Sequence, residues 1–392
     1  MKKIQQALKK CKKRFDFFEE LSKQDEYKTK TRLDNIDLIK ALAIYLVVIY
    51  HFSKIPINII EPDSYWNYFN LYLKSFFSIC VPVFFFVNGV LLLNKEKIDI
   101  KKHIKKTVNI VILTVLWGFI TLIALICIRG EMLSLPQIVK GSWTLKQTWN
   151  NHLWFLCALV VIYVFYPLIH SVYHSNRKSF YFFFVCVVLF TFGNTLLGNL
   201  ATTMSYFSNK FTNTNFMINY FTNYNPFRGI GGYSIGYFML GGLLGGILRA
   251  TIREHKRKLT IIATLAIPIS MLCLFLYAIF ASLRSKVMWD VVWNGYDTIF
   301  TLINVVAIFI ISLHYKSCGW VGNFISIVGK NSLGIYFFHW IIGNILQPFY
   351  VELECSTMFL TNIFYAFVIL LCSLLLTMIL KKIPGMKYLV SI

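Results

Sequence analysis

Charged residues are scarce in this chain of 392 residues, and acidic residues are the scarcest. Only 14% of the residues are charged, against about 25% in an average soluble domain. Hydrophobic residues make up 57%, and Asp plus Glu number 17 against 39 Lys plus Arg. This balance excludes an ordinary soluble globular domain and predicts a polytopic membrane protein with a basic surface.

The sequence also contains no short-spaced cysteine pair, no phosphate-binding loop and no signal-peptide core before residue 35. The nine cysteines have neither C-x-x-C spacing nor paired histidines, which excludes a disulfide framework and a zinc site. The sequence GKNS at Gly329 to Ser332 lacks the glycine five positions before Gly329 that a phosphate loop needs. No signal-peptide core precedes residue 35. We therefore expect no bound metal or cofactor, no ATP-dependent step, and a first apolar stretch that serves as its own insertion signal.

Long apolar stretches are abundant instead. A helix that crosses the hydrocarbon core needs about 20 mainly apolar residues, and ten such stretches lie near residues 35–53, 69–93, 108–128, 153–170, 180–200, 229–248, 259–280, 296–314, 332–350 and 359–380. Without an internal repeat, they predict an all-α fold of about ten transmembrane helices in one bundle. The predicted domains are a basic, amphipathic or disordered N-terminal tail over 1–34, the membrane domain over 35–380, and a short tail over 381–392.

Basic residues indicate the orientation of this bundle, because Lys and Arg gather in short cytoplasmic loops. With ten spans both termini lie on one side, where tails and loops hold 29 Lys plus Arg, while the other side holds eight. Both termini are therefore predicted to be cytoplasmic, in a multi-pass protein of the cell membrane. The net charge of +22 needs no nucleic acid as a partner, because a basic inner face attracts anionic lipid head groups.

The first stretch, DLIKALAIYLVVIYH from Asp37 to His51, contains two ionisable side chains at helical spacing. Eleven residues make about three full helical turns, so Lys40 and His51 share a face and stand roughly 16 Å apart along the axis. Ionisable groups at this depth usually face a bundle interior or a watery cavity. We predict that this face lines a cavity and that Asp37 pairs with Lys40. The alternative is that Lys40 snorkels to the interface and that a backbone carbonyl satisfies His51.

Four segments in order resemble the acyltransferase 3 family, whose members are integral membrane enzymes that O-acylate cell-surface carbohydrates. They are the K-x10-H pair of Lys40 and His51, FFSICVPVFFFVNGVLLL (Phe76 to Leu93), HLWFLCALVVIYVFYPLI (His152 to Ile169) and VGKNSLGIYFFHWII (Val328 to Ile342). The resemblance spans nearly the whole chain. Two positions depart from the family pattern: Lys40 stands where the family usually has Arg, and Asn88 stands where it commonly has Ser.

The resemblance implies transfer of an acyl group from acyl-CoA, most simply acetyl-CoA, to a carbohydrate hydroxyl. His51 suits the general base, because a neutral imidazole accepts a proton near neutral pH, and His339 is a second candidate catalytic residue. Lys40 and Asn88 would bind the donor on the cytoplasmic side. Trp154 and Arg228 would bind the acceptor. For His339 the alternative is a packed histidine, and for Trp154 and Arg228 it is a place at the membrane interface.

Two other function classes stay open on the sequence. A cavity lined by Lys and His also suits a transporter or exporter of a small solute or glycan, although no inverted repeat or matched pair of broken helices supports one. A non-catalytic membrane scaffold leaves the K-x10-H face unexplained. The sequence does not define the acceptor, distinguish acetyl from succinyl, or indicate an oligomeric state. The eight glycines from Gly229 to Gly246 predict close helix contacts.

Overall fold

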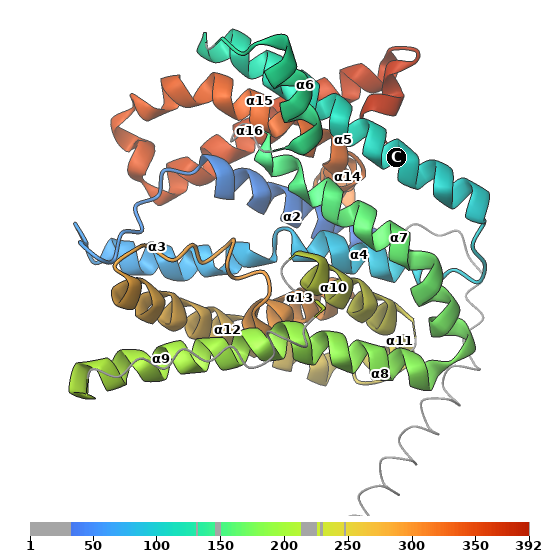
Figure 1. Cartoon of the computed structure of the whole chain (residues 1–392), viewed down its shortest axis with the longest axis horizontal. Coiled ribbons are helices and arrows are strands. Elements are labelled where there is room, and N and C mark those ends of the chain that lie inside the picture. Colours follow the sequence, from blue (N-terminus) through green and yellow to red (C-terminus); the bar gives the residue numbers. More distant parts are fainter. Residues whose placement is uncertain are drawn as a thin grey trace, which may run out of the picture.

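A computed structural model describes residues 33–130, 132–145, 150–212, 226–227, 230–246 and 248–391. These residues form helices joined by short connections, and no strand occurs among them. The helices are stacked in layers, with blue α2 between the red α15 and α16 and the light-blue α3 and α4 (Figure 1). The predicted all-α fold is confirmed. The apolar stripe expected in the N-terminal tail falls outside the described residues.

Each of the ten predicted stretches coincides with a helical segment. These segments are α2 (Asp34–Phe52), α3 (Trp66–Ser75) with η1 (Phe76–Ile79) and α4 (Pro82–Leu92), α5 (Ile100–Arg129), η2 (Asn151–Leu153) with α7 (Trp154–Ser175), α8 (Arg177–Val188) with the π-helical turn η3 (Leu189–Gly193) and α9 (Asn194–Thr212), α10 (Ile230–Gly245), α12 (Lys256–Ser285), α13 (Ile299–Ser312), α15 (Ser332–Val351) and α16 (Phe359–Lys382). Seven of them are long and apolar enough to cross a membrane, and α10 and α13 are shorter apolar helices. The count of ten spans and the orientation of the termini stay predictions.

Within the described residues, the connections contain three helices that the apolar pattern does not indicate. They are α6 (Leu135–Thr144), α11 (Arg249–Glu254) and α14 (Gly319–Lys330), and two short 3-10 turns, η4 (Glu354–Thr357) and η5 (Met386–Leu389), follow. Local capping explains where some helices begin. The side chain of Gln137 accepts the Ser134 N–H (2.8 Å) at the start of α6. At the start of α5 the Asp99 carboxylate accepts the Lys102 N–H (3.1 Å), and this bond lowers the pKa of Asp99.

Glycines bring α4 and α10 into backbone contact. A Cβ atom on Gly241 of α10 would overlap the carbonyl oxygen of Phe86, and one on Gly89 of α4 would overlap that of Phe238. Small residues allow membrane helices to approach closely where dispersion forces, rather than water exclusion, hold them together. The close contacts predicted for the glycines of α10 are thus confirmed at Gly241.

Both ends of α2 are held by glycines of neighbouring helices. At the first turn, a Cβ on Gly329 of α14 would overlap the backbone of Asp37. At the last turn, a Cβ on Gly343 of α15 would overlap the ring of Phe52. These contacts set α2 directly against α14 and α15, and α2 is the helix that carries Lys40 and His51.

The last described residues fold back onto the bundle. Nε1 of Trp117, in the middle of α5, donates a hydrogen bond to the carbonyl of Leu389 (2.7 Å), and Val390 is buried. The same indole stacks on Phe337 of α15, with ring centroids 4.6 Å apart. The residues after α16, predicted as a short tail, therefore pack against α5.

Candidate active site

Two neighbouring cavities lie within the bundle, and side chains of α2 line both. The histidine cavity, of about 440 Å³, is lined by His51, His152, Tyr336, Trp340 and further aromatic side chains. The lysine cavity, of about 280 Å³, is lined by Lys40, Lys106, Lys330 and Lys381, with Asn88. Lys40 and His51 both line a cavity, as predicted. The prediction of one shared cavity is wrong, because each residue lines a different one. The reason is that Phe155 and Tyr336, from α7 and α15, lie between the two cavities and line both.

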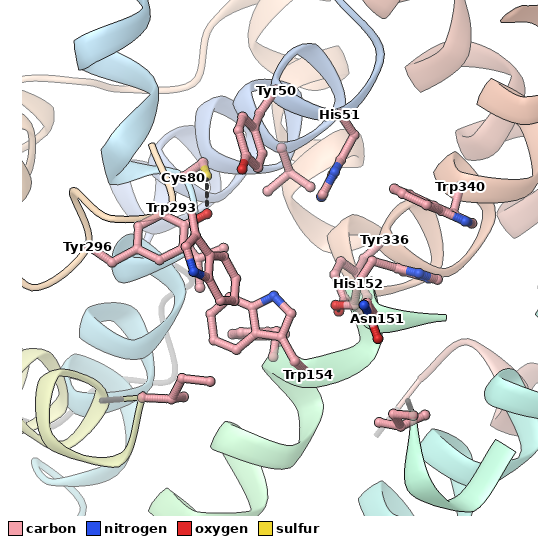
Figure 2. Close-up of a pocket in the computed structure, with 15 residues that line it drawn as sticks. Tyr50, His51, Cys80, Asn151, His152, Trp154, Trp293, Tyr296, Tyr336 and Trp340 are labelled. Atoms are coloured by element: carbon pink, nitrogen blue, oxygen red, sulfur yellow. Dashed lines mark hydrogen bonds between the residues drawn. The ribbon is translucent and has the colours of Figure 1, made fainter. Parts of the chain in front are cut away.

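Three histidines gather around Trp340 at the histidine cavity. The ring of His51 lies 5.0 Å from Trp340 and 5.6 Å from His339, measured between centroids. His152 stacks on Trp340 at 4.8 Å and lies 5.7 Å from His339. Figure 2 shows His51, His152, Tyr336 and Trp340 on one side of the cavity. The two histidines predicted from the sequence are thus brought together, and His152 joins them.

His339 is fully buried and is not itself part of the cavity lining. Its Nδ1 lies 2.5 Å from the carbonyl oxygen of Tyr336, and a carbonyl only accepts hydrogen bonds, so Nδ1 carries the hydrogen of the neutral ring. The other nitrogen, Nε2, has no hydrogen-bond partner among the described residues. This tautomer leaves a buried lone pair beside His51.

The contact between α2 and α15 has a local origin in the sequence. Gly343 lies one helical turn after His339 and receives the ring of Phe52, the residue that follows His51. Any larger residue at 343 would push the two helices apart. The pairing of a glycine with a phenylalanine therefore places the two imidazoles at contact distance.

Aromatic rings form the opposite side of the histidine cavity. Trp154 meets Trp293 edge to face at 4.9 Å, and Trp293 lies 5.8 Å from Tyr296. Figure 2 shows these rings across the cavity from His51, with the contact of 3.4 Å between Cys80 Sγ and Tyr296 Oη drawn as a dashed line. Trp293 is 41% exposed, and indole faces at a cavity suit the apolar faces of a sugar, the role predicted for Trp154.

Asp290 organises the segment that carries Trp293. One carboxylate oxygen accepts the N–H groups of Val292 (3.0 Å) and Trp293 (3.2 Å), and the other accepts the hydroxyl of Tyr50 (2.6 Å). Tyr50 precedes His51 on α2 and also lines the cavity. This carboxylate therefore ties α2 to the aromatic side of the cavity. The sequence offered no signal for it, because Asp290 stands alone in a loop.

The lysine cavity collects cations from four separate segments. Lys40 lies in the second turn of α2, Lys106 in the second turn of α5, Lys330 at the end of α14 and Lys381 at the end of α16. Nζ of Lys381 donates to Asn331 Oδ1 (2.6 Å), and Nζ of Lys106 lies over the ring of Tyr163 at 5.5 Å. No acidic side chain is among the described residues that line this cavity. Its chemistry suits an anionic group such as phosphate.

Asn88 lines the lysine cavity, as its predicted donor role requires. Its amide donates to the Phe84 carbonyl of the preceding turn (2.8 Å), and its Oδ1 accepts the hydroxyl of Tyr163 (3.4 Å).

Asp37 is buried and accepts a hydrogen bond from Ser326 Oγ (3.2 Å). The pair predicted between Asp37 and Lys40 stays a prediction. Arg228, the other predicted acceptor residue, falls outside the described residues.

Sequence reasoning missed His152 and three of the four lysines. His152 opens the family-like segment that contains Trp154, and Lys330 belongs to the GKNS segment, so both had a local signal. In the sequence, Lys106 and Lys381 look like ordinary basic residues beside loops. Only the packing of α5 and α16 around α15 brings them together. Among the described residues no group of His, Cys, Asp or Glu is arranged to hold a metal ion.

Comparison with known proteins identifies the family. A family model described as an acyltransferase domain matches residues 33–381, which is most of the chain. The match includes every residue that lines either cavity except Val390 and Ser391. No curated protein and no solved structure matches the chain. The family model covers the K-x10-H pair and all three other segments that carry the resemblance. The chain therefore belongs to the acyltransferase 3 family of membrane acyltransferases.

Proposed function

We propose that this protein is an integral membrane O-acyltransferase that transfers an acyl group, most simply acetyl, from acyl-CoA to a hydroxyl of a cell-surface or exported carbohydrate. The observation that carries the proposal is the pair of cavities at the two ends of α2, one lined by four lysines and the other by histidines and aromatic rings. A donor rich in phosphate and an acceptor rich in hydroxyls need two such different environments.

The lysine cavity would bind the phosphates of the donor. Lys40, Lys106, Lys330 and Lys381 supply point charges from four segments, and Lys is a common phosphate ligand although it lacks the bidentate fork of Arg. Four converging cations also compensate for Lys40 standing where the family usually has Arg. Asn88 would contact the donor beside them.

The histidine cavity would bind the acceptor sugar against Trp154 and Trp293. His51 lines this cavity and would act as the general base. The hydroxyl oxygen of the sugar attacks the thioester carbonyl, so that the ester C–O bond forms and the thioester C–S bond breaks. His51 takes the hydroxyl proton and returns it to the leaving thiolate, which departs as free CoA.

His339 would act through His51 as a positioning residue. Its Nδ1–H is held by the Tyr336 carbonyl, so its Nε2 presents a fixed lone pair beside the ring of His51. Packed against His51 with ring centroids 5.6 Å apart, this fixed ring limits the orientations that the His51 imidazole can adopt, as a positioned general base requires.

The test is transfer of labelled acetyl from acetyl-CoA to glycan in sealed membrane vesicles of both orientations. Inside-out vesicles, which expose the cytoplasmic face, should label their glycan, whereas sealed right-side-out vesicles should not. Matched vesicles from cells that lack the protein provide the control. Mass spectrometry of surface glycans from the two kinds of cells identifies the acyl group and the acceptor. Equal acyl content in both cells would contradict the proposal and favour a transport function.

A further inference from the structure

The two cavities meet at an aromatic partition formed by Phe155 and Tyr336. These two side chains line both cavities, their ring centroids lie 5.5 Å apart, and the rings are set edge to face. Phe155 is 7% exposed and Tyr336 is 6% exposed. A molecule that extends from the lysine cavity to His51 has to pass these rings.

The surrounding side chains hold the partition in place. The hydroxyl of Tyr336 donates a hydrogen bond to the backbone carbonyl of His152. Phe155 packs against Phe85 at 5.1 Å and against Phe84 at 5.7 Å, both on α4. The partition therefore joins three helices, and neither ring can turn aside without disturbing a neighbour.

We propose, resting on the function proposed above, that Phe155 and Tyr336 select the size of the transferred acyl group. The thioester arm enters from the lysine cavity and the hydroxyl from the histidine cavity, so the carbonyl carbon reacts beside the partition. There the ester C–O bond forms, the thioester C–S bond breaks, and the hydroxyl proton passes to the departing thiolate through His51. The substituent on the carbonyl carbon then lies against the two rings.

The packing of the partition favours a short acyl group. Phe84, Phe85 and Tyr336 surround the ring of Phe155, so an additional methylene has to displace one of them. A single methylene in an apolar pocket changes discrimination by roughly 10- to 200-fold. The structure thus assigns acetyl, rather than a longer chain, as the group that fits.

The experiment compares acetyl-CoA, butyryl-CoA and hexanoyl-CoA as donors for the detergent-purified full-length protein, with kcat/KM as the readout. The wild type should use acetyl-CoA at least tenfold better than butyryl-CoA, and hexanoyl-CoA hardly at all. Phe155→Ala removes one ring of the partition and should raise the ratio of butyryl to acetyl transfer at least tenfold. Phe155→Leu, which leaves more of the packing, should raise it by a smaller factor.

Phe182→Ala is the matched control, because it removes the same side-chain volume at a ring on α8 that is 74% exposed and lines neither cavity. It should leave the kcat/KM of every donor, and therefore the chain-length ratio, unaltered. A wild type that transfers hexanoyl as fast as acetyl would overturn the inference without any variant. Unchanged ratios in active Phe155→Ala and Phe155→Leu proteins would overturn it too. Absence of transfer from every donor would instead contradict the proposed function.

Discussion

The imidazoles of His51 and His339 lie 5.6 Å apart between centroids, on helices from opposite ends of the chain. Only one of them faces the histidine cavity directly, whereas the other is fully buried and held by a backbone carbonyl. His51 can therefore touch a substrate, whereas His339 can only orient His51. Substitution of His51 and substitution of His339 should therefore have different effects on activity.

His51→Ala should leave the protein folded and reduce acetyl transfer by roughly 10²- to 10⁴-fold, the loss typical of an acid–base group. His51→Gln should be nearly as inactive, because an amide forms hydrogen bonds without a useful proton-accepting function. His255→Ala, at an exposed histidine between α11 and α12, provides the control and should match the wild type. Vesicle transfer rates per amount of protein are the measurement. Wild-type rates in His51→Gln would exclude His51 as the base.

His339→Asn should lower kcat while the KM for acetyl-CoA stays constant. The Asn amide can still donate to the Tyr336 carbonyl, but the imidazole ring that packs against His51 is lost. Misplacement of a reacting group by about 1 Å can cost up to about 10²-fold in rate. The pH dependence of kcat should change as well, because the environment of His51 changes. An unaltered pH profile with an unaltered kcat would make His339 a packing residue only.

Lys40→Met should raise the KM for acetyl-CoA roughly 10- to 100-fold, since a hydrogen bond to a charged group contributes about 1.5–3 kcal/mol. Lys40→Arg keeps the charge and should bind the donor at least as well. Lys140→Met is a suitable control, because Lys140 is an exposed lysine on α6 and lines neither cavity. The KM values of purified variants provide the comparison. Equal KM values for Lys40→Met and wild type would leave Lys40 a snorkelling residue.

Gly343→Ala should destabilise the contact between α15 and α2, because the added Cβ overlaps the ring of Phe52. Overpacking of this kind costs about 1–3 kcal/mol, and acetyl transfer should fall as His51 and His339 separate. Gly198→Ala on α9 meets no atom within 4 Å and should be neutral. Thermal unfolding in detergent measures both variants. Equal unfolding temperatures for the two would contradict the packing argument.

Trp117→Phe should detach the segment that closes one side of the lysine cavity. The change keeps a ring to stack on Phe337 but removes the hydrogen bond to Leu389, and the loss of such a bond costs about 0.5–1.5 kcal/mol. Val390 and Ser391 line the lysine cavity, so the KM for acetyl-CoA should rise. Trp320→Phe, at an indole that is 81% exposed on α14, should change neither KM nor stability. Limited proteolysis of the C-terminal segment reports the detachment directly.

Much of this architecture could be predicted locally. Apolar stretches of about 20 residues mark membrane helices because the bilayer demands them, and every predicted stretch coincides with a helical segment. The shared face of Lys40 and His51 follows from the helical repeat alone. The four family-like segments were sufficient to indicate the family that the comparison later identified.

The division into two cavities was decided only by the tertiary structure. Lys40 and His51 share a helix face, but Phe155 from α7 and Tyr336 from α15 separate the spaces that the two residues enter. Lys106 and Lys381 likewise converge only because α5 and α16 pack beside α15. Helical periodicity is a property of neighbours in sequence, whereas these contacts join residues far apart in the chain. Their geometry depends on how closely the helices approach, which glycines such as Gly343 determine through side chains on the opposite helix.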